Sequence, residues 1–218
     1  MADALEHSEL HISHLEKILG LMSHKNIDFS DLYLESTENE SWFLEDNCVK
    51  EGVHQIQRGM GVRTISGTQT GFAFSNDMTR EAIEQCARHA RAIVSAGTTK
   101  QINLTKNLAT TTFYSDDSPI TSLQDDEKLG LIKNLNARIR KADPRVKDVK
   151  INLSGQHSSI LVAHSIEGIF KDSRPLVRLN VTVVVESDGR KETASYGGGA
   201  RSTYDVFSQD NFAETIAD

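Results

Sequence analysis

The sequence predicts an α+β fold in which an antiparallel β-sheet is flanked by helices. Two observations predict this class. Apolar residues recur at three- and four-residue spacing in three separate segments, which is typical of amphipathic helices. Between and after these segments, apolar and polar residues alternate in runs bounded by turn-forming residues, which indicates antiparallel strands joined as a meander.

The first helix is expected between Leu5 and Met22, with Asn26 as its stop signal. Its apolar residues form one stripe: Leu5, Leu10, Ile12, Leu15, Ile18, Leu19 and Met22. Residues 29–75 then change to the two-residue period of strands. Turn-forming residues interrupt this region at Glu38–Glu40, Asp46–Asn47, Gly52, Gly59, Gly67 and Gly71. The region therefore predicts short strands with frequent turns.

A second helix follows, capped by Asp77 or Thr79 and ended by Gly97. Its inward stripe is Ala82, Ile83, Cys86, Ala87, Ala90, Ile93 and Val94. Residues 98–121 are rich in Thr, Ser, Asn and Asp, which is typical of a connection between two parts. Because this stretch is long for a structureless loop, we expect a short strand around Thr112–Tyr114 within it.

A third helix is expected to open at Ser122, with Asp125 completing a weak capping box, and to end before Pro144. Its inward residues are Leu129, Ile132, Leu135 and Ile139. The chain then returns to strands, with a hairpin predicted at Asp188–Gly189.

The order of these elements predicts two units. Residues 1–97 form a helix–meander–helix unit, residues 98–121 a linker, and residues 122–218 a second unit of a helix and antiparallel strands. The two halves share this outline, which is compatible with an ancient duplication. The final residues lack a cap or a polar tail, so we expect the sequence to be a piece of a longer protein.

Composition narrows the functional class. The net charge is −7, and the basic residues are dispersed, which disfavours a nucleic-acid partner. No apolar run reaches membrane-spanning length and no secretory signal opens the chain, so we expect a cytoplasmic protein without a membrane partner. The two cysteines, Cys48 and Cys86, are too few for a disulfide framework and are expected to be buried free thiols.

Histidine spacing raises one metal-site hypothesis. His7, His11 and His14 fall on roughly one helix face, where neutral imidazoles could bind zinc or nickel. Glu9 lies off that face, so no water-activating carboxylate accompanies them. An exposed helix face near the N-terminus explains the same residues, and we favour it. We therefore assign no metal-binding and no catalytic residue in this chain.

Two glycine-rich strings allow a binding role. Gly59–Arg63 superficially resembles a phosphate loop, but a strand rather than a helix follows it, so a strand with close backbone neighbours is the better interpretation. Gly197, Gly198 and Gly199 can expose backbone groups at a peptide-binding edge, act as a hinge, or form a plain flexible turn, which we favour.

Three strand arginines are further candidates: Arg63, Arg178 and Arg201. Each can bind a substrate carboxylate through two hydrogen bonds, although pairing with an acidic residue of this chain is the more common use.

An ordered set of short motifs resembles the TldD/PmbA family of metallopeptidases, on the side of the TldD-type subunit. The motifs are Asp31-Leu-Tyr33, Glu40-Ser-Trp42, Leu44-Glu-Asp46, Gly59-Met-Gly-Val-Arg63, Ile65-Ser-Gly67, Thr70-Gly-Phe-Ala73, Glu84-Gln85, Ala90-Arg91, Arg174-Pro-Leu-Val-Arg-Leu179 and the glycine-rich stretch ending at Arg201. The resemblance covers the chain from about residue 28 onward and corresponds to the N-terminal region of the family.

The resemblance implies a cytoplasmic zinc peptidase that works as a heterodimer with a PmbA/TldE-like partner subunit and trims unfolded or modified peptides. Family members hold zinc with a His-Glu-x-x-x-His helix and a later Cys. This sequence contains no such motif, and neither Cys48 nor Cys86 matches the family cysteine. We therefore expect no cofactor in this chain, zinc in the full-length family protein, and no activity from this chain alone.

Two functions follow as hypotheses. In the first, the chain is the substrate-channel and assembly region of a TldD-like peptidase, with Arg63, Arg178, Gly197, Gly198, Gly199 and Arg201 lining a groove for an unfolded peptide. In the second, it is a non-catalytic interaction module that binds a partner subunit. A third hypothesis, metal binding by the N-terminal histidines, rests on spacing alone.

Overall fold

The computed structural model describes residues 10–23, 26–94, 108–109 and 113–207. The described strands are β1 (Phe29–Glu45), β2 (Cys48–Ser66), β3 (Gln69–Ser75), β4 (Leu108–Ala109), β5 (Val146–His164), β6 (Gly168–Ser187) and β7 (Arg190–Ala200). The helices are α1 (Ile12–Met22), α2 (Arg80–Val94), α3 (Pro119–Ser122), α4 (Asp125–Ala142) and the 3-10 turn η1 (Tyr204–Phe207).

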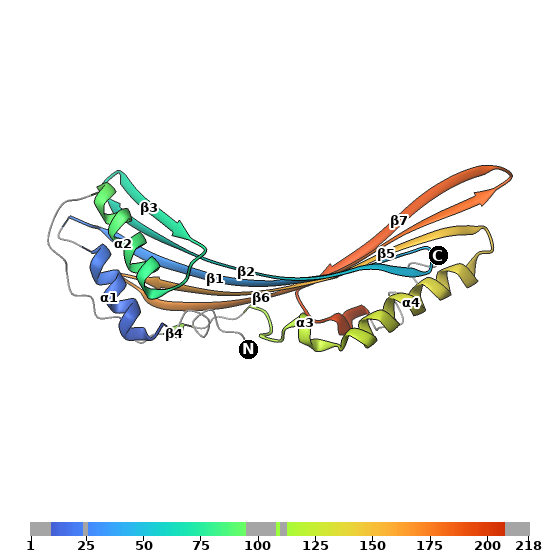
Figure 1. Ribbon diagram of the computed structural model, residues 1–218, viewed down its shortest axis with the longest axis horizontal. Coiled ribbons are helices and arrows are strands. Elements are labelled where there is room, and N and C mark those ends of the chain that lie inside the picture. The colour runs from blue at the N-terminus through green and yellow to red at the C-terminus, as the bar shows by residue number, and fades with distance from the viewer. Residues whose placement is uncertain (1–9, 24–25, 95–107, 110–112, 208–218) are drawn as a thin grey trace. The chain divides into compact units, whose positions relative to one another are not determined.

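The described strands belong to one sheet in the order β3-β2-β1-β5-β6-β4, with β7 paired to β6 (Figure 1). β3 is antiparallel to β2 and β7 is antiparallel to β6, whereas the two-residue strand β4 is parallel to β6. Helices flank this sheet, and the predicted α+β class is confirmed.

Three hairpin turns lie where turn chemistry predicted them: Asp46–Asn47, Gly67 (φ 55°) and Asp188–Gly189. Asp46 and Asn47 have φ angles of 52° and 60°, and Asp188 and Gly189 have φ angles of 52° and 78°. Two consecutive positive φ values characterise the type I′ turn, which matches the twist of the flanking strands. Asp, Asn and Gly adopt these angles at little cost, so local sequence is sufficient to define both of these type I′ hairpins.

Most of the other predicted turns are wrong, and the strands are much longer than expected. Glu38–Glu40 lies inside β1, Gly52 and Gly59 lie inside β2, and Gly71 lies inside β3. Close packing explains two of these glycines. A Cβ on Gly71 would overlap the backbone carbonyl of Ala90 in α2, and one on Gly52 would lie 2.9 Å from the Trp42 ring. These glycines admit a neighbour rather than a change of direction.

The chain divides into two compact units, each built from three stretches of sequence. Unit 1 takes the described residues of Met1–Thr37, Gln57–Phe113 and Ser158–Ser173. Unit 2 takes those of Glu38–Ile56, Tyr114–His157 and Arg174–Asp218. The units expected from sequence, residues 1–97 and 122–218 joined by the linker 98–121, are each continuous stretches of chain. The compact units of the structure are not continuous, because β1, β2, β5 and β6 each contribute residues to both.

Unit 1 is closed by two packed helices. α2 contacts α1 and β3, and the buried residues of α1 are Leu15, Ile18, Leu19 and Met22. α1 is shorter than predicted and ends at Met22, with Ser23 as its C-cap. The predicted stripe of α2 holds for Ile83, Ala87, Ala90 and Val94 but is wrong for Ile93, which is 60% exposed. Leu5 and Gly97 lie outside the described residues.

Unit 2 is closed by α4, whose Ile132, Leu135 and Ile139 pack in one core cluster with Ile151 of β5 and Leu179 of β6. The predicted start of this helix is wrong. Residues 119–122 form the separate short helix α3, in which the Ser122 hydroxyl donates to the Pro119 carbonyl oxygen (2.8 Å). α4 begins at Asp125, and the Gln124 backbone N–H donates to the carboxylate of Glu127 (2.7 Å).

Two smaller expectations also change. The strand expected at Thr112–Tyr114 is not formed by Phe113 or Tyr114, and the described strand of this region is β4; Thr112 lies outside the described residues. Cys48 is exposed rather than buried, since it opens β2 directly after a hairpin turn. Cys86 is half-buried, and its burial raises the pKa of its thiol. No described helix is both long and apolar enough to cross a membrane.

Candidate functional site

The candidate groove residues do not gather in one place. Arg178 lies on β6, Gly197, Gly198 and Gly199 lie on β7, and Arg201 follows β7, all in unit 2. Arg63 lies on β2 in unit 1. The residues of the β6–β7 ladder are therefore the candidate site, and Arg63 is considered separately.

The three glycines belong to a regular strand. In the antiparallel ladder Arg178 pairs with Gly199, Leu179 with Gly198, and Asn180 with Gly197. The flexible turn favoured from sequence is wrong, whereas the hinge stays a prediction. Among the described strands β7 pairs only with β6, so its other edge presents backbone N–H and C=O groups without a described strand partner.

Close approach to β6 explains the choice of glycine at two of these positions. A Cβ on Gly199 would lie 2.7 Å from the carbonyl oxygen of Val177, and a Cβ on Gly197 would lie 2.9 Å from that of Leu179. Any side chain here would collide with the backbone of the neighbouring strand. As a result, β7 carries no side chain directly opposite Arg178 and Asn180.

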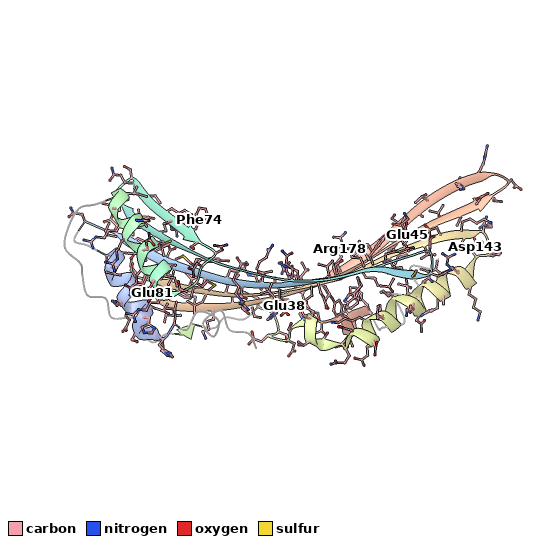
Figure 2. All side chains as sticks on the ribbon, in the orientation of Figure 1. Glu38, Glu45, Phe74, Glu81, Asp143 and Arg178 are labelled. Carbon is pink, nitrogen blue, oxygen red and sulfur yellow. The ribbon has the colours of Figure 1, made fainter. Side chains whose placement is uncertain are left out.

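The side chain of Arg178 is exposed, and one hydrogen bond restrains its guanidinium (Figure 2). Its Nε donates to Oδ1 of Asn180 at 3.0 Å, two residues along the same strand. No carboxylate within the described ranges pairs with it. The single contact at Nε leaves the two terminal nitrogens of the guanidinium available to a ligand.

Arg63 is engaged within the chain. Its Nε and Nη2 donate to the two carboxylate oxygens of Asp31 at 3.2 and 2.5 Å. Its guanidinium carbon lies 5.3 Å from the centre of the Phe29 ring. The hydrogen bonds that Arg63 donates to Asp31 raise the pKa of Arg63. This is the internal pairing considered from sequence: it occupies the Nε–Nη2 edge of the guanidinium and neutralises its charge within the chain.

Arg201 fixes the segment after β7. Its Nη1 donates to the carbonyl oxygen of Pro175 (3.4 Å), and its guanidinium carbon lies 5.6 Å from the centre of the Tyr114 ring. The side chain therefore packs between segments of unit 2, and this geometry assigns it a structural contact.

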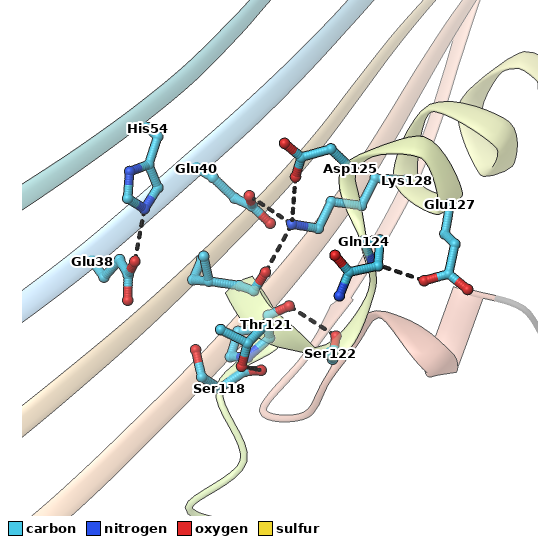
Figure 3. Close-up of polar contacts among 12 residues, drawn as sticks. Glu38, Glu40, His54, Ser118, Thr121, Ser122, Gln124, Asp125, Glu127 and Lys128 are labelled. Atoms are coloured by element: carbon cyan, nitrogen blue, oxygen red, sulfur yellow. Dashed lines mark hydrogen bonds and ion pairs between the residues drawn. The ribbon is translucent and has the colours of Figure 1, made fainter. Parts of the chain in front are cut away.

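A buried polar cluster in unit 2 was missed by the sequence analysis. Lys128 of α4 is 1% exposed, and its Nζ lies 2.9 Å from Oε2 of Glu40, 2.8 Å from the Ile120 carbonyl oxygen and 3.5 Å from Oδ1 of Asp125 (Figure 3). The spacing contained the signal, because Lys128 stands four residues before Ile132 on the inward stripe.

Tyr204 completes this cluster. Its side chain is fully buried, and Lys128 Nζ lies 5.8 Å from the centre of its ring. Burial, with a smaller contribution from Glu40, raises the pKa of its phenol. Gly155 of β5 makes room for it, since a Cβ there would lie 2.9 Å from Tyr204 Cζ. The cluster joins α3, α4 and η1 to the sheet of unit 2, which is a structural task.

The histidine hypothesis finds no support in the described residues. His7 lies outside them, and the backbone N–H of His11 donates to Nδ1 of His14 (3.2 Å) at the start of α1. Nε2 of His54 lies 2.7 Å from Oε1 of Glu38 (Figure 3). Within the described ranges no three His, Cys, Asp or Glu side chains lie close enough to hold a metal ion. These residues therefore do not fit a zinc site.

Comparison with known families identifies the chain. Residues 30–94 match the model of PmbA/TldA metallopeptidase domain 1, and residues 118–218 match the central domain of the same family. Two relatives are each described as a metalloprotease TldD homolog. The one from Haemophilus influenzae is 37% identical over 205 residues, covering 92% of this chain and 42% of the relative. The one from Buchnera aphidicola subsp. Schizaphis graminum is 36% identical over 195 residues, covering 88% and 40%.

Solved structures agree on the fold. A putative modulator of a DNA gyrase from Thermotoga maritima superimposes with a TM-score of 0.74 at 13% identity, covering 94% of this chain and 46% of that one. TldE from Thermococcus kodakarensis gives a TM-score of 0.61 at 12% identity, covering 98% and 46%. The chain belongs to the PmbA/TldD metallopeptidase family and spans about two-fifths of the length of the curated relatives that it matches.

Proposed function

We propose that this chain is the substrate-channel and assembly region of a TldD-like zinc metallopeptidase of the cytoplasm. In this proposal the chain holds unfolded or modified peptides in an extended form, beside a PmbA/TldE-like partner subunit. Zinc and the residues that break the peptide bond belong to the rest of such a protein, where the metal supplies a Lewis acid. The relatives named as metalloproteases support the peptidase class.

The observation that carries the proposal is the edge of β7. This strand is exposed along nearly its whole length and pairs on one side only within the described residues. An added peptide strand would exchange main-chain hydrogen bonds with such an edge irrespective of its sequence. Sequence-independent binding suits a peptidase whose substrates share an unfolded state rather than a motif.

A binding assay on this chain tests the proposal. A fluorescent unstructured peptide is titrated in the presence of zinc, with fluorescence anisotropy reporting binding and mass spectrometry reporting cleavage. We expect binding, slower amide hydrogen exchange in β7, and an intact peptide. A folded, cross-linked version of the same peptide serves as the control and should not bind. Cleavage by this chain would refute the proposal that the rest of the protein breaks the peptide bond. Binding that leaves hydrogen exchange in β7 unchanged would refute the proposal that the β7 edge holds the peptide.

The second candidate, an interaction module without a substrate, has its own supporting observation. Phe72 and Phe74 of β3 are 55% and 76% exposed, and their ring centres lie 6.0 Å apart. Figure 2 labels Phe74 on this strand. Adjacent exposed aromatic rings on an edge strand are typical of protein–protein contacts. If this is the main role, replacing Phe74 by Ser should weaken capture of a TldE-like subunit in size-exclusion chromatography and leave peptide binding unchanged.

A further inference from the structure

We propose that Arg178 recognises a carboxylate of the peptide held at the β7 edge, so that the preferred ligand is an extended peptide bearing a negative charge beside the glycine stretch. This inference rests on the proposed function and adds a substrate class to it. It starts from the difference between the two strand arginines. Arg63 is neutralised by Asp31, whereas no carboxylate of the described residues neutralises Arg178.

The geometry of the ladder gives Arg178 access to the edge. Neighbouring strands lie about 4.8 Å apart, so a peptide added outside β7 would lie about 10 Å from β6. The side chain of Arg178 would have to cross β7 to meet it. At that point β7 presents Gly199 directly opposite Arg178 and Gly197 opposite Asn180. Since Gly199 has no side chain, the path over β7 from Arg178 is open at that position, while the Asn180 side chain fills the space over Gly197.

The hydrogen bond to Asn180 prepares the guanidinium for this contact. Asn180 Oδ1 accepts from Nε only, which restrains the side chain and leaves Nη1 and Nη2 as donors. A carboxylate can take both donors in a charge-assisted pair with planar geometry, which lysine cannot reproduce. The same row of β6 continues with Thr182, whose hydroxyl is already paired with Ser195 (2.9 Å). Within the paired part of this row, Arg178 lies opposite the glycine stretch, and Glu186 lies opposite Lys191 at the hairpin end.

The charge of the whole chain sharpens the inference. A net charge of −7 repels acidic peptides at long range. Any preference for a carboxylate near the glycine stretch must therefore come from a local contact. Arg178 provides one there, whereas Arg190 and Lys191 of β7 lie at the hairpin end of the ladder. The carboxylate has two sources, an Asp or Glu side chain and the C-terminal α-carboxylate, and they share the same chemistry.

The test uses four versions of one unstructured fluorescent peptide. The peptide carries either one Glu or Gln in its centre, and either a free or an amidated C-terminus. Anisotropy titrations compare the unsubstituted chain with Arg178→Gln, Arg178→Lys and Arg58→Gln. Arg58 is an exposed arginine on β2 and serves as the matched loss of one charge.

For the unsubstituted chain we expect peptides with the recognised carboxylate to bind about tenfold more tightly than the fully neutral version. Arg178→Gln should abolish this preference, Arg178→Lys should retain only a small part of it, and Arg58→Gln should leave it intact. The pair of peptide changes identifies which carboxylate is read. Circular dichroism and hydrogen exchange on β6 and β7 verify that the Arg178 variants keep their fold.

The outcomes separate this inference from the function on which it rests. If all four peptides bind equally, or if Arg178→Gln keeps the preference, carboxylate recognition is overturned while peptide holding stands. If Arg58→Gln removes the preference as completely as Arg178→Gln, the effect is general charge and the inference also fails. If no version binds, both the inference and the proposed function are rejected.

Discussion

The two units use the same kinds of elements, helices packed on antiparallel strands, but they are held together differently. The core cluster that contains α1 and α2 of unit 1 consists of apolar buried side chains, and the ion pair between these helices, Lys17 with Glu84, lies at the surface. Unit 2 buries an ion pair, Lys128 with Glu40, together with Tyr204. The two strand arginines show the reverse pattern. Arg63 of unit 1 forms an ion pair with Asp31, whereas Arg178 of unit 2 has no carboxylate partner among the described residues.

This contrast distinguishes charged side chains that pair within the chain from the one, Arg178, that we propose binds a ligand. In unit 2 the buried Lys128 ammonium of α4 contacts Glu40 of β1 and the Ile120 carbonyl oxygen of α3. The exposed Arg178 on the β6–β7 ladder donates to Asn180 and has no carboxylate partner among the described residues. In unit 1 Arg63 is paired with Asp31, and two exposed residues of the edge strand β3, Phe72 and Phe74, are aromatic. The difference supports the proposals that unit 2 holds the peptide and that unit 1 contacts another protein.

The buried pair provides the largest expected effect. Lys128→Met leaves Glu40 buried without its partner, which should lower the free energy of unfolding by about 3–5 kcal/mol. The control Lys17→Met removes the exposed pair of unit 1 and should cost less than about 1 kcal/mol. Urea unfolding followed by circular dichroism measures both.

The double variant Lys128→Met with Glu40→Leu makes this test specific. Removing both charges together should recover most of the lost stability, because a well-packed apolar pair can replace a buried ion pair. Equal losses for the two single lysine variants would contradict the distinction between the units.

A glycine pair tests the same cluster with a smaller change. Gly155→Ala places a Cβ against the Tyr204 ring and should cost about 1–3 kcal/mol through overpacking. Gly130→Ala is the matched control, because Gly130 lies inside α4 with open space around its Cα. It should stabilise the chain by about 0.5–1 kcal/mol. The melting temperatures of the two variants should therefore shift in opposite directions. A stabilising Gly155→Ala would show that the Tyr204 ring is not tightly packed against Gly155.

Local chemistry accounts for what could be predicted from the sequence. The turns at Asp46–Asn47 and Asp188–Gly189 were correct, because Asp, Asn and Gly favour the required φ angles wherever they occur. The buried stripe of α2 was correct at Ile83 and Ala87 because helical spacing alone places these residues on one face.

Tertiary contact decides the rest. The role of Gly71 depends on α2 lying against it, and the sequence does not reveal that neighbour. Arg63 and Arg178 look alike in sequence, and only the contact with Asp31, 32 residues away, separates them. Lys128 occupied an inward position, but a lysine is assigned to the surface unless its buried partner Glu40, 88 residues away, is known.

The surface pair of unit 1 gives the smallest expected effect and a dependence on pH. The Glu84 carboxylate accepts from Lys17 (2.9 Å), Arg80 (3.1 Å) and Arg88 (3.2 Å). These contacts, that with Lys17 first, hold the pKa of Glu84 below its ordinary value of 4.5. A carboxyl group whose pKa is lower in the folded state stabilises the fold above its unfolded pKa, and this stabilisation disappears as the pH falls through the folded value.

Glu84→Gln should therefore cost less than about 1 kcal/mol at neutral pH, and this cost should shrink as the pH falls through the folded pKa of Glu84, where the carboxylate becomes a neutral acid. Because the partners of Glu84 are exposed, about 1 M salt should reduce the neutral-pH difference as well. The Lys128–Glu40 pair is shielded from solvent, so salt should change the cost of Lys128→Met far less. Urea unfolding at low and high salt compares the two, and an equal salt response would place both pairs in the same environment and remove the contrast between the units.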